Sequence, residues 1–151
     1  MPFLLLFVTF CWRLGAERKR EMKDGLKSHF LNLYSMVMAD GEVSSKEKME
    51  LYRIGEEFYG VTPETMDRLV FSDEILFYIP QTEEERVLYL YDVALIAWAD
   101  GKVVDEERAL MERLALRFDV KEDEVQTLVD FLIEKAKARL SHDDLLKEFS
   151  V

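Results

Sequence analysis

A nine-residue turn that occurs twice constrains this chain more than any other feature. Residues 39–47 read ADGEVSSKE and residues 99–107 read ADGKVVDEE, so Asp40 and Asp100 occupy equivalent places 60 residues apart. Each copy stands between two stretches in which apolar residues recur at helical spacing. Such self-similarity indicates a fold built from related units. Because two copies are too few for a solenoid, the sequence predicts one helical bundle with two related helix–turn–helix halves.

The spacing of apolar residues predicts an all-α fold, a single compact bundle of about seven helices. The expected helices cover residues 24–39, 44–59, 62–70, 82–98, 105–118, 121–140 and 141–149. Six glycines and three prolines in 151 residues supply little turn chemistry, which argues against a many-stranded β fold. The apolar run at residues 75–79 fits either a buried helical turn or an extended connector.

Several helix starts carry capping signals. Ser44 is followed three residues later by Glu47, and Thr82 by Glu85, which is the pattern of a capping box. In the second turn Val104 occupies the place of Ser44, so we expect the capping role there to move to Asp105.

Residues 1–21 form an apolar-then-basic leader, distinct from a helical domain at residues 22–151. The apolar run from Pro2 to Trp12 is about half the ~20 residues that a membrane-spanning helix needs. Three interpretations remain open: a short membrane anchor with its basic cluster on the cytoplasmic side, an amphipathic or buried helix of the domain, or a wrongly assigned gene start. The sequence favours the third, with Met22 as the true start, because a globular pattern begins directly after it.

Charge and residue types exclude several functions. The net charge of −11 disfavours nucleic acid as a partner, because an acidic surface repels phosphates. The single cysteine, Cys11, permits neither an internal disulfide nor a thiolate zinc site. The sequence contains no glycine-rich phosphate loop and no visible nucleophile–His–Asp arrangement, so we predict no enzyme and identify no small-molecule substrate. His29 and His142 lack ligand spacing, and we expect them to be exposed or hydrogen-bonded rather than metal ligands.

The two turns, ADGEVSSKE and ADGKVVDEE, resemble the paired acidic turns of the tellurite-resistance TerB-like domain, whose fold also forms the N-terminal domain of the DjlA membrane co-chaperone. The resemblance covers about residues 24–140. It implies an all-α fold of about seven helices and a cytoplasmic setting, with the inner face of the membrane as a peripheral location. It also implies a divalent-cation site whose residues, carried over by position, are Asp40, Glu47, Asp100 and Glu107. No His-Pro-Asp tripeptide occurs, so the J-domain function of DjlA is not implied.

The acidic turns have two physical interpretations. Calcium, the first candidate cation, takes six to eight oxygen ligands, so a site would need both turns together. The turns are not EF-hand loops, because Gly41 and Gly101 stand second when counted from the Asp of each turn, whereas an EF-hand loop has its glycine sixth. Alternatively, the same residues are purely structural: each Asp would accept from free N–H groups of the next helix, and each Glu would lie in a favourable first turn.

Two functions therefore remain. One is a non-enzymatic TerB-like stress or metal-response module that binds a divalent cation or a partner protein through an acidic surface. The other is a metal-free scaffold or adaptor domain tethered to a membrane protein. Both functions include a protein partner, and a membrane-associated protein is one candidate for it.

Overall fold

The regular structure is α-helical throughout the described residues, which are 25–39, 41, 43–71 and 77–150 of the computed structural model. A first helix covers residues 25–37. It is followed by α2 (Ser45–Tyr59), α3 (Pro63–Val70), α4 (Glu83–Trp98), α5 (Asp105–Arg117), α6 (Glu122–Lys137) and α7 (His142–Phe149). The prediction of an all-α bundle of about seven helices is confirmed.

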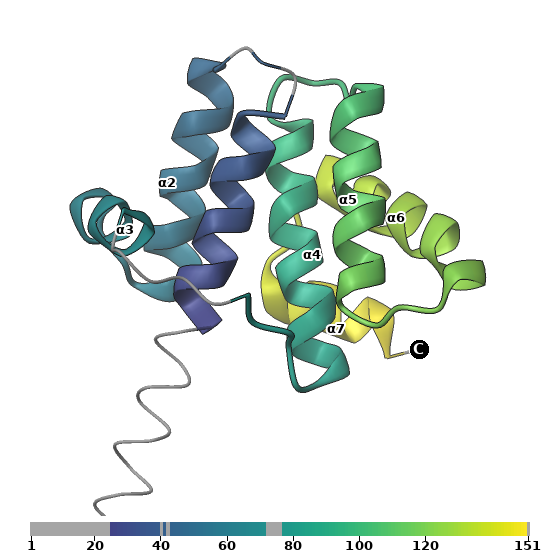
Figure 1. Ribbon diagram of the computed structural model, residues 1–151. Coiled ribbons are helices and arrows are strands. Elements are labelled where there is room, and N and C mark those ends of the chain that lie inside the picture. Colours follow the sequence, from purple (N-terminus) through teal and green to yellow (C-terminus); the bar gives the residue numbers. More distant parts are fainter. Residues whose placement is uncertain (1–24, 40, 42, 72–76, 151) are drawn as a thin grey trace, which may run out of the picture.

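Helix α4 lies at the centre of the bundle (Figure 1). Residues 87–98 read VLYLYDVALIAW and are apolar on nearly every side, and a helix of that kind must be covered all round. Accordingly α4 packs against α2, α5, α6 and α7. Helix α4 and the helices around it together supply the largest fully buried side chains, which are Phe30, Leu33, Met36, Leu51, Ile54, Met66, Leu90, Tyr91, Ile96, Met111, Phe118 and Leu132.

The sequence repeat is also a structural repeat. The first helix and α2 form one helix–turn–helix unit, and α4 and α5 form the other (Figure 1). Gly41 and Gly101 adopt nearly the same left-handed conformation, with φ of 81° and 83°. After the second helix of each unit, Gly60 and Asp119 both have φ of 64°. The two halves therefore reverse the chain in the same way at both ends of their second helix.

Three local predictions need correction or lie outside the described residues. Val104, not Asp105, is the N-cap residue of α5, and its side chain makes no capping hydrogen bond. Helix α6 ends at Lys137 rather than at residue 140, because Arg139 adopts a left-handed φ of 53° before the chain turns into α7. Residues 72–76 and the leader lie outside the described part, while residues 77–80 are neither helix nor strand.

The helix starts mostly follow the predicted caps. The side chains of Ser44, Thr62, Thr82 and Ser141 each accept from a backbone N–H three residues later. None of the helices in the described residues is long and apolar enough to cross a membrane.

Candidate functional site

The two acidic turns meet at one end of the bundle (Figure 1). Ser44 begins α2, and its Oγ donates a hydrogen bond of 2.6 Å to Oδ1 of Asp100 in the turn after α4. The side chain of Glu47, in the first turn of α2, is also close enough to Asp100 to influence the pKa of its carboxyl group. The compensation that sequence analysis expected from the next helix thus comes from a hydroxyl 56 residues earlier in the chain.

The hydrogen bond from Ser44, followed by the influence of Glu47, lowers the pKa of Asp100 below its ordinary value of 3.8. Two carboxylates held close together repel one another when both are ionised. A cation between them removes that repulsion. The contact between Glu47 and Asp100 is therefore chemically suited to hold a metal ion.

The predicted metal ligands are brought together in part. Glu47 and Glu107 occupy equivalent first turns of α2 and α5, and their exposed fractions are 1% and 2%. Asp40 lies outside the described residues. Within the part of the chain that the structure describes, no group of three or more His, Cys, Asp and Glu side chains is arranged to hold a metal ion. What the described residues do bring together is Glu47 and Asp100, one residue from each turn.

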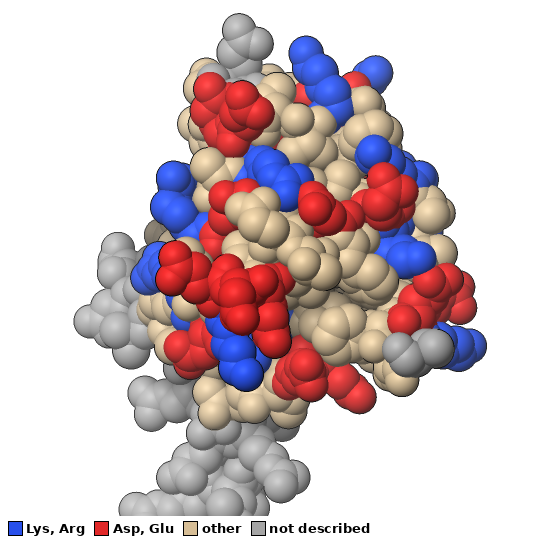
Figure 2. All heavy atoms as spheres, turned by 90° about the vertical axis from the view of Figure 1, so that its right-hand side faces the viewer, with Lys and Arg blue, Asp and Glu red and all other residues tan. Residues whose placement is uncertain are grey.

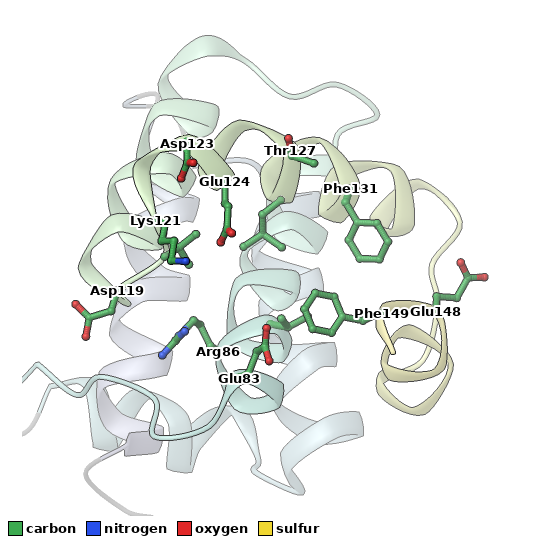
Figure 3. Close-up of a pocket in the computed structure, with 13 residues that line it drawn as sticks. Glu83, Arg86, Asp119, Lys121, Asp123, Glu124, Thr127, Phe131, Glu148 and Phe149 are labelled. Atoms are coloured by element: carbon green, nitrogen blue, oxygen red, sulfur yellow. The ribbon is translucent and has the colours of Figure 1, made fainter. Parts of the chain in front are cut away.

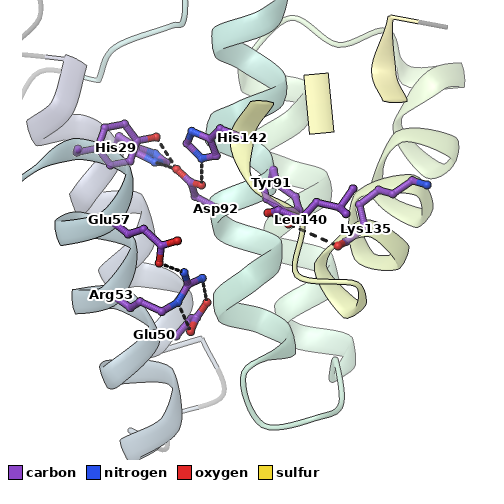
Figure 4. Close-up of polar contacts among 10 residues, drawn as sticks. His29, Glu50, Arg53, Glu57, Tyr91, Asp92, Lys135, Leu140 and His142 are labelled. Carbon is purple, nitrogen blue, oxygen red and sulfur yellow. Dashed lines mark hydrogen bonds and ion pairs between the residues drawn. The ribbon is translucent and has the colours of Figure 1, made fainter. Parts of the chain in front are cut away.

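A second polar cluster surrounds Asp92, in the middle of α4 (Figure 4). The side chain of Asp92 is completely buried and accepts hydrogen bonds from three other helices. His29 Nε2 of the first helix lies 2.8 Å from Oδ2, and His142 Nε2 of α7 lies 2.7 Å from Oδ1. The hydroxyl of Tyr59, at the end of α2, donates to Oδ2 over 2.5 Å. One carboxylate thus joins four helices.

The hydrogen bonds determine the ionisation of this cluster. Burial by itself would raise the pKa of Asp92, but the hydrogen bonds from His142 and His29 outweigh it and hold that pKa below its ordinary value of 3.8. Because an ionised Asp92 only accepts, each histidine presents Nε2–H to it. The Nδ1 atom of His29 is buried, with no hydrogen-bond partner among the described residues. The hydrogen bonds therefore keep the buried Asp92 in its ionised form.

The two histidines were expected to be exposed or hydrogen-bonded, and the second alternative is confirmed for both. Sequence analysis missed that they share a partner, since 63 and 50 residues separate them from Asp92. One signal could have found it: Asp92 is the only charged residue in the apolar run 87–98. A buried carboxylate needs nearby donors.

An acidic groove lies on another face, between the start of α4, the turn before α6, and α7 (Figure 3). It has a volume of about 720 Å³, and its apolar part includes Phe131 and Phe149, whose ring centres are 6.2 Å apart. Two cations line it, Arg86 and Lys121, together with five carboxylates: Glu83, Asp119, Asp123, Glu124 and Glu148. Glu148 pairs with Lys135, whereas the other four form no ion pair within the described residues. From the side of α5 and α6, acidic side chains gather in several clusters, with Lys and Arg side chains and uncharged surface between them (Figure 2).

Comparison with known proteins found no match in a scan of protein-family models, in a search of curated proteins or in a search of solved structures. The resemblance to the TerB-like domain therefore stays a prediction that rests on the two turns.

Proposed function

We propose that this chain is a non-enzymatic stress or metal-response module that binds a divalent cation between its two acidic turns. The contact between the carboxyl groups of Glu47 and Asp100 carries the proposal. The TerB-like resemblance supports a cytoplasmic setting at the inner face of a membrane, and that part of the proposal rests on the resemblance alone.

The chemistry of the turns favours a hard cation. Glu47 and Asp100 supply carboxylate oxygens, and the Ser44 hydroxyl, 2.6 Å from Asp100, supplies a further oxygen. Calcium and magnesium prefer oxygen ligands of these kinds, with water completing the coordination. Asp40 and Glu107 remain the predicted partners that would bring the count of carboxylates to four. Calcium is the first candidate, because it tolerates irregular geometry better than magnesium does.

A thermal melt tests this proposal. We expect calcium at 100 times its dissociation constant to stabilise the protein by about 2.7 kcal/mol.

Glu47→Gln should abolish this stabilisation, and the matched variant Glu56→Gln, on the exposed surface of the same helix, should retain it. A melt that is insensitive to millimolar calcium, magnesium, manganese and zinc would refute the proposed site. Equal stabilisation of the two variants by calcium would place the ion elsewhere.

The acidic groove favours a second candidate function, a metal-free adaptor that docks a partner protein. Four of its carboxylates are without ion pairs among the described residues and surround an apolar floor, which is complementary to a basic segment with an apolar side chain.

We expect a synthetic peptide of alternating lysine and leucine to bind this groove, and to bind more weakly as the salt concentration rises. Asp123→Asn should weaken binding, whereas Asp143→Asn, an exposed aspartate in the first turn of α7, should not. Equal effects of the two variants would indicate attraction by net charge alone.

A further inference from the structure

A cavity of about 700 Å³ opens at the end of α4 that is remote from the acidic turns. It lies where the start of the first helix, the end of α2 and the starts of α4 and α7 come together. Glu85 lines this cavity, and Asp100 belongs to the turns; along the axis of α4 the two residues are about 22 Å apart. The cavity is therefore separate from the proposed metal site.

Aromatic rings form much of the cavity wall. Phe58, Tyr59, Tyr78, Tyr89 and His142 all line it. His142 stacks on Phe58 with ring centres 3.9 Å apart, and its side chain is 18% exposed. Rings arranged around a hollow can present their electron-rich faces to a bound cation.

Hydrogen bonds to carboxylates hold these rings in place. Tyr59 and His142 donate to the buried Asp92, over 2.5 Å and 2.7 Å. On the other side, Tyr78 donates to Glu85 over 3.4 Å. A wall fixed in this way loses little side-chain entropy when a ligand enters.

The charge of the site is negative. Glu84 and Glu85 line the cavity, and neither Lys nor Arg is among the described residues that line it. Behind the wall lies Asp92, whose hydrogen bonds from the histidines hold it in the ionised form. Donation from Tyr59 and His142 to that carboxylate also makes their rings richer in electrons, which strengthens attraction to a cation.

We propose that this cavity binds an organic ammonium ion, with a quaternary or methylated ammonium group against the aromatic rings and its charge facing Glu84 and Glu85. An inorganic cation would gain less, because it would have to exchange its water shell for ring faces rather than for oxygen ligands. A neutral molecule of the same shape would gain the apolar contact without the electrostatic attraction.

Choline and its neutral isostere 3,3-dimethyl-1-butanol test the proposal on the full chain. Proton NMR of the imidazole signals follows binding, since the chain has two histidines and one of them lines the cavity. We expect choline to shift the signals of His142 more than those of the buried His29, and to bind at least about tenfold more tightly than the neutral isostere.

Two neighbouring glutamates of the first turn of α4 provide a matched pair of variants. Glu84 lines this cavity and Glu83 lines the acidic groove instead, while both are exposed and either change to Gln alters net charge equally. We expect Glu84→Gln to weaken choline binding several-fold and Glu83→Gln to leave it unchanged. Equal binding of choline and its isostere, equal effects of the two variants, or no shift of His142 would each overturn the proposal.

Discussion

Asp92 keeps its negative charge at a position where burial alone would remove it. Three donors from three other helices surround its two oxygens, and two of them, the histidines, lower its pKa. Hydrogen bonds offset part of the desolvation penalty of a buried carboxylate, whereas loss of a partner leaves that penalty uncompensated. The single residue therefore couples the positions of the first helix, α2, α4 and α7.

Asp92→Asn should lower the free energy of unfolding by about 3–5 kcal/mol at neutral pH, because an amide cannot accept from all three donors and places its own N–H₂ group among them. Since folding lowers the pKa of Asp92 below 3.8, its contribution is complete above about pH 4 and is lost as pH falls through the folded value. Urea unfolding between pH 2 and pH 7 measures both effects.

The acid limb of the stability curve should therefore be flatter in Asp92→Asn than in the wild-type protein. Asp143→Asn, on the exposed surface of α7, should retain the wild-type slope. Parallel curves for the wild type and Asp92→Asn would show that the buried carboxylate does not titrate as its hydrogen bonds imply.

At the scale of the helix, the start of α2 combines two roles in one side chain. Ser44 accepts from the N–H of Glu47 as an N-cap, over 3.5 Å, and its hydroxyl donates to Asp100 of the other turn. Ser141 caps α7 through the N–H of Asp144, over 3.2 Å, and its side chain makes no other hydrogen bond within the described residues. The first cap therefore also joins the two halves of the fold, and the second is local.

Ser44→Ala should cost about 1–2 kcal/mol of unfolding free energy, against about 1 kcal/mol for Ser141→Ala, because the first change removes a cap and a bond between turns. A double-mutant cycle of Ser44→Ala with Asp100→Ala, measured by urea unfolding, isolates the second contribution. Additive losses in that cycle would mean that the bond to Asp100 contributes nothing to stability.

For the molecule as a whole, the net charge of −11 is a source of self-repulsion. Acidic residues are concentrated at first turns of helices, where the helix dipole favours them, as at Glu83–Glu85 of α4 and Glu122–Glu124 of α6. The same acidic residues therefore stabilise the helices in which they lie and destabilise the folded state through their mutual repulsion over longer distances.

Raising sodium chloride from about 10 mM to about 150 mM shortens the Debye length from about 30 Å to about 8 Å, and should raise the melting temperature by about 2–4 °C. Calcium chloride at the same ionic strength should raise it further, because binding at the turns adds to screening. Equal shifts with the two salts in thermal melts would argue against a specific calcium site.

The sequence alone was enough for the helices, the repeat and most caps. The apolar spacing, the capping residues and the glycines of the turns are local signals, and they act on residues three or four positions apart. The start of α5 at Asp105 was predicted, but its N-cap, Val104, was missed because the Val104 side chain makes no capping hydrogen bond. The end of α6 was placed too late because nothing in the local pattern marks the left-handed Arg139.

The functional pairings were decided by tertiary structure. Ser44 pairs with Asp100, and both His29 and His142 pair with Asp92, over separations of 50 to 63 residues in the chain. Only the packing of the helices brings these residues together. The spacing of apolar residues places His29 and His142 on helices but does not show that both contact Asp92. They do so because Asp92 is buried in α4, and a buried charged side chain is stable only where other helices bring hydrogen-bond donors to it.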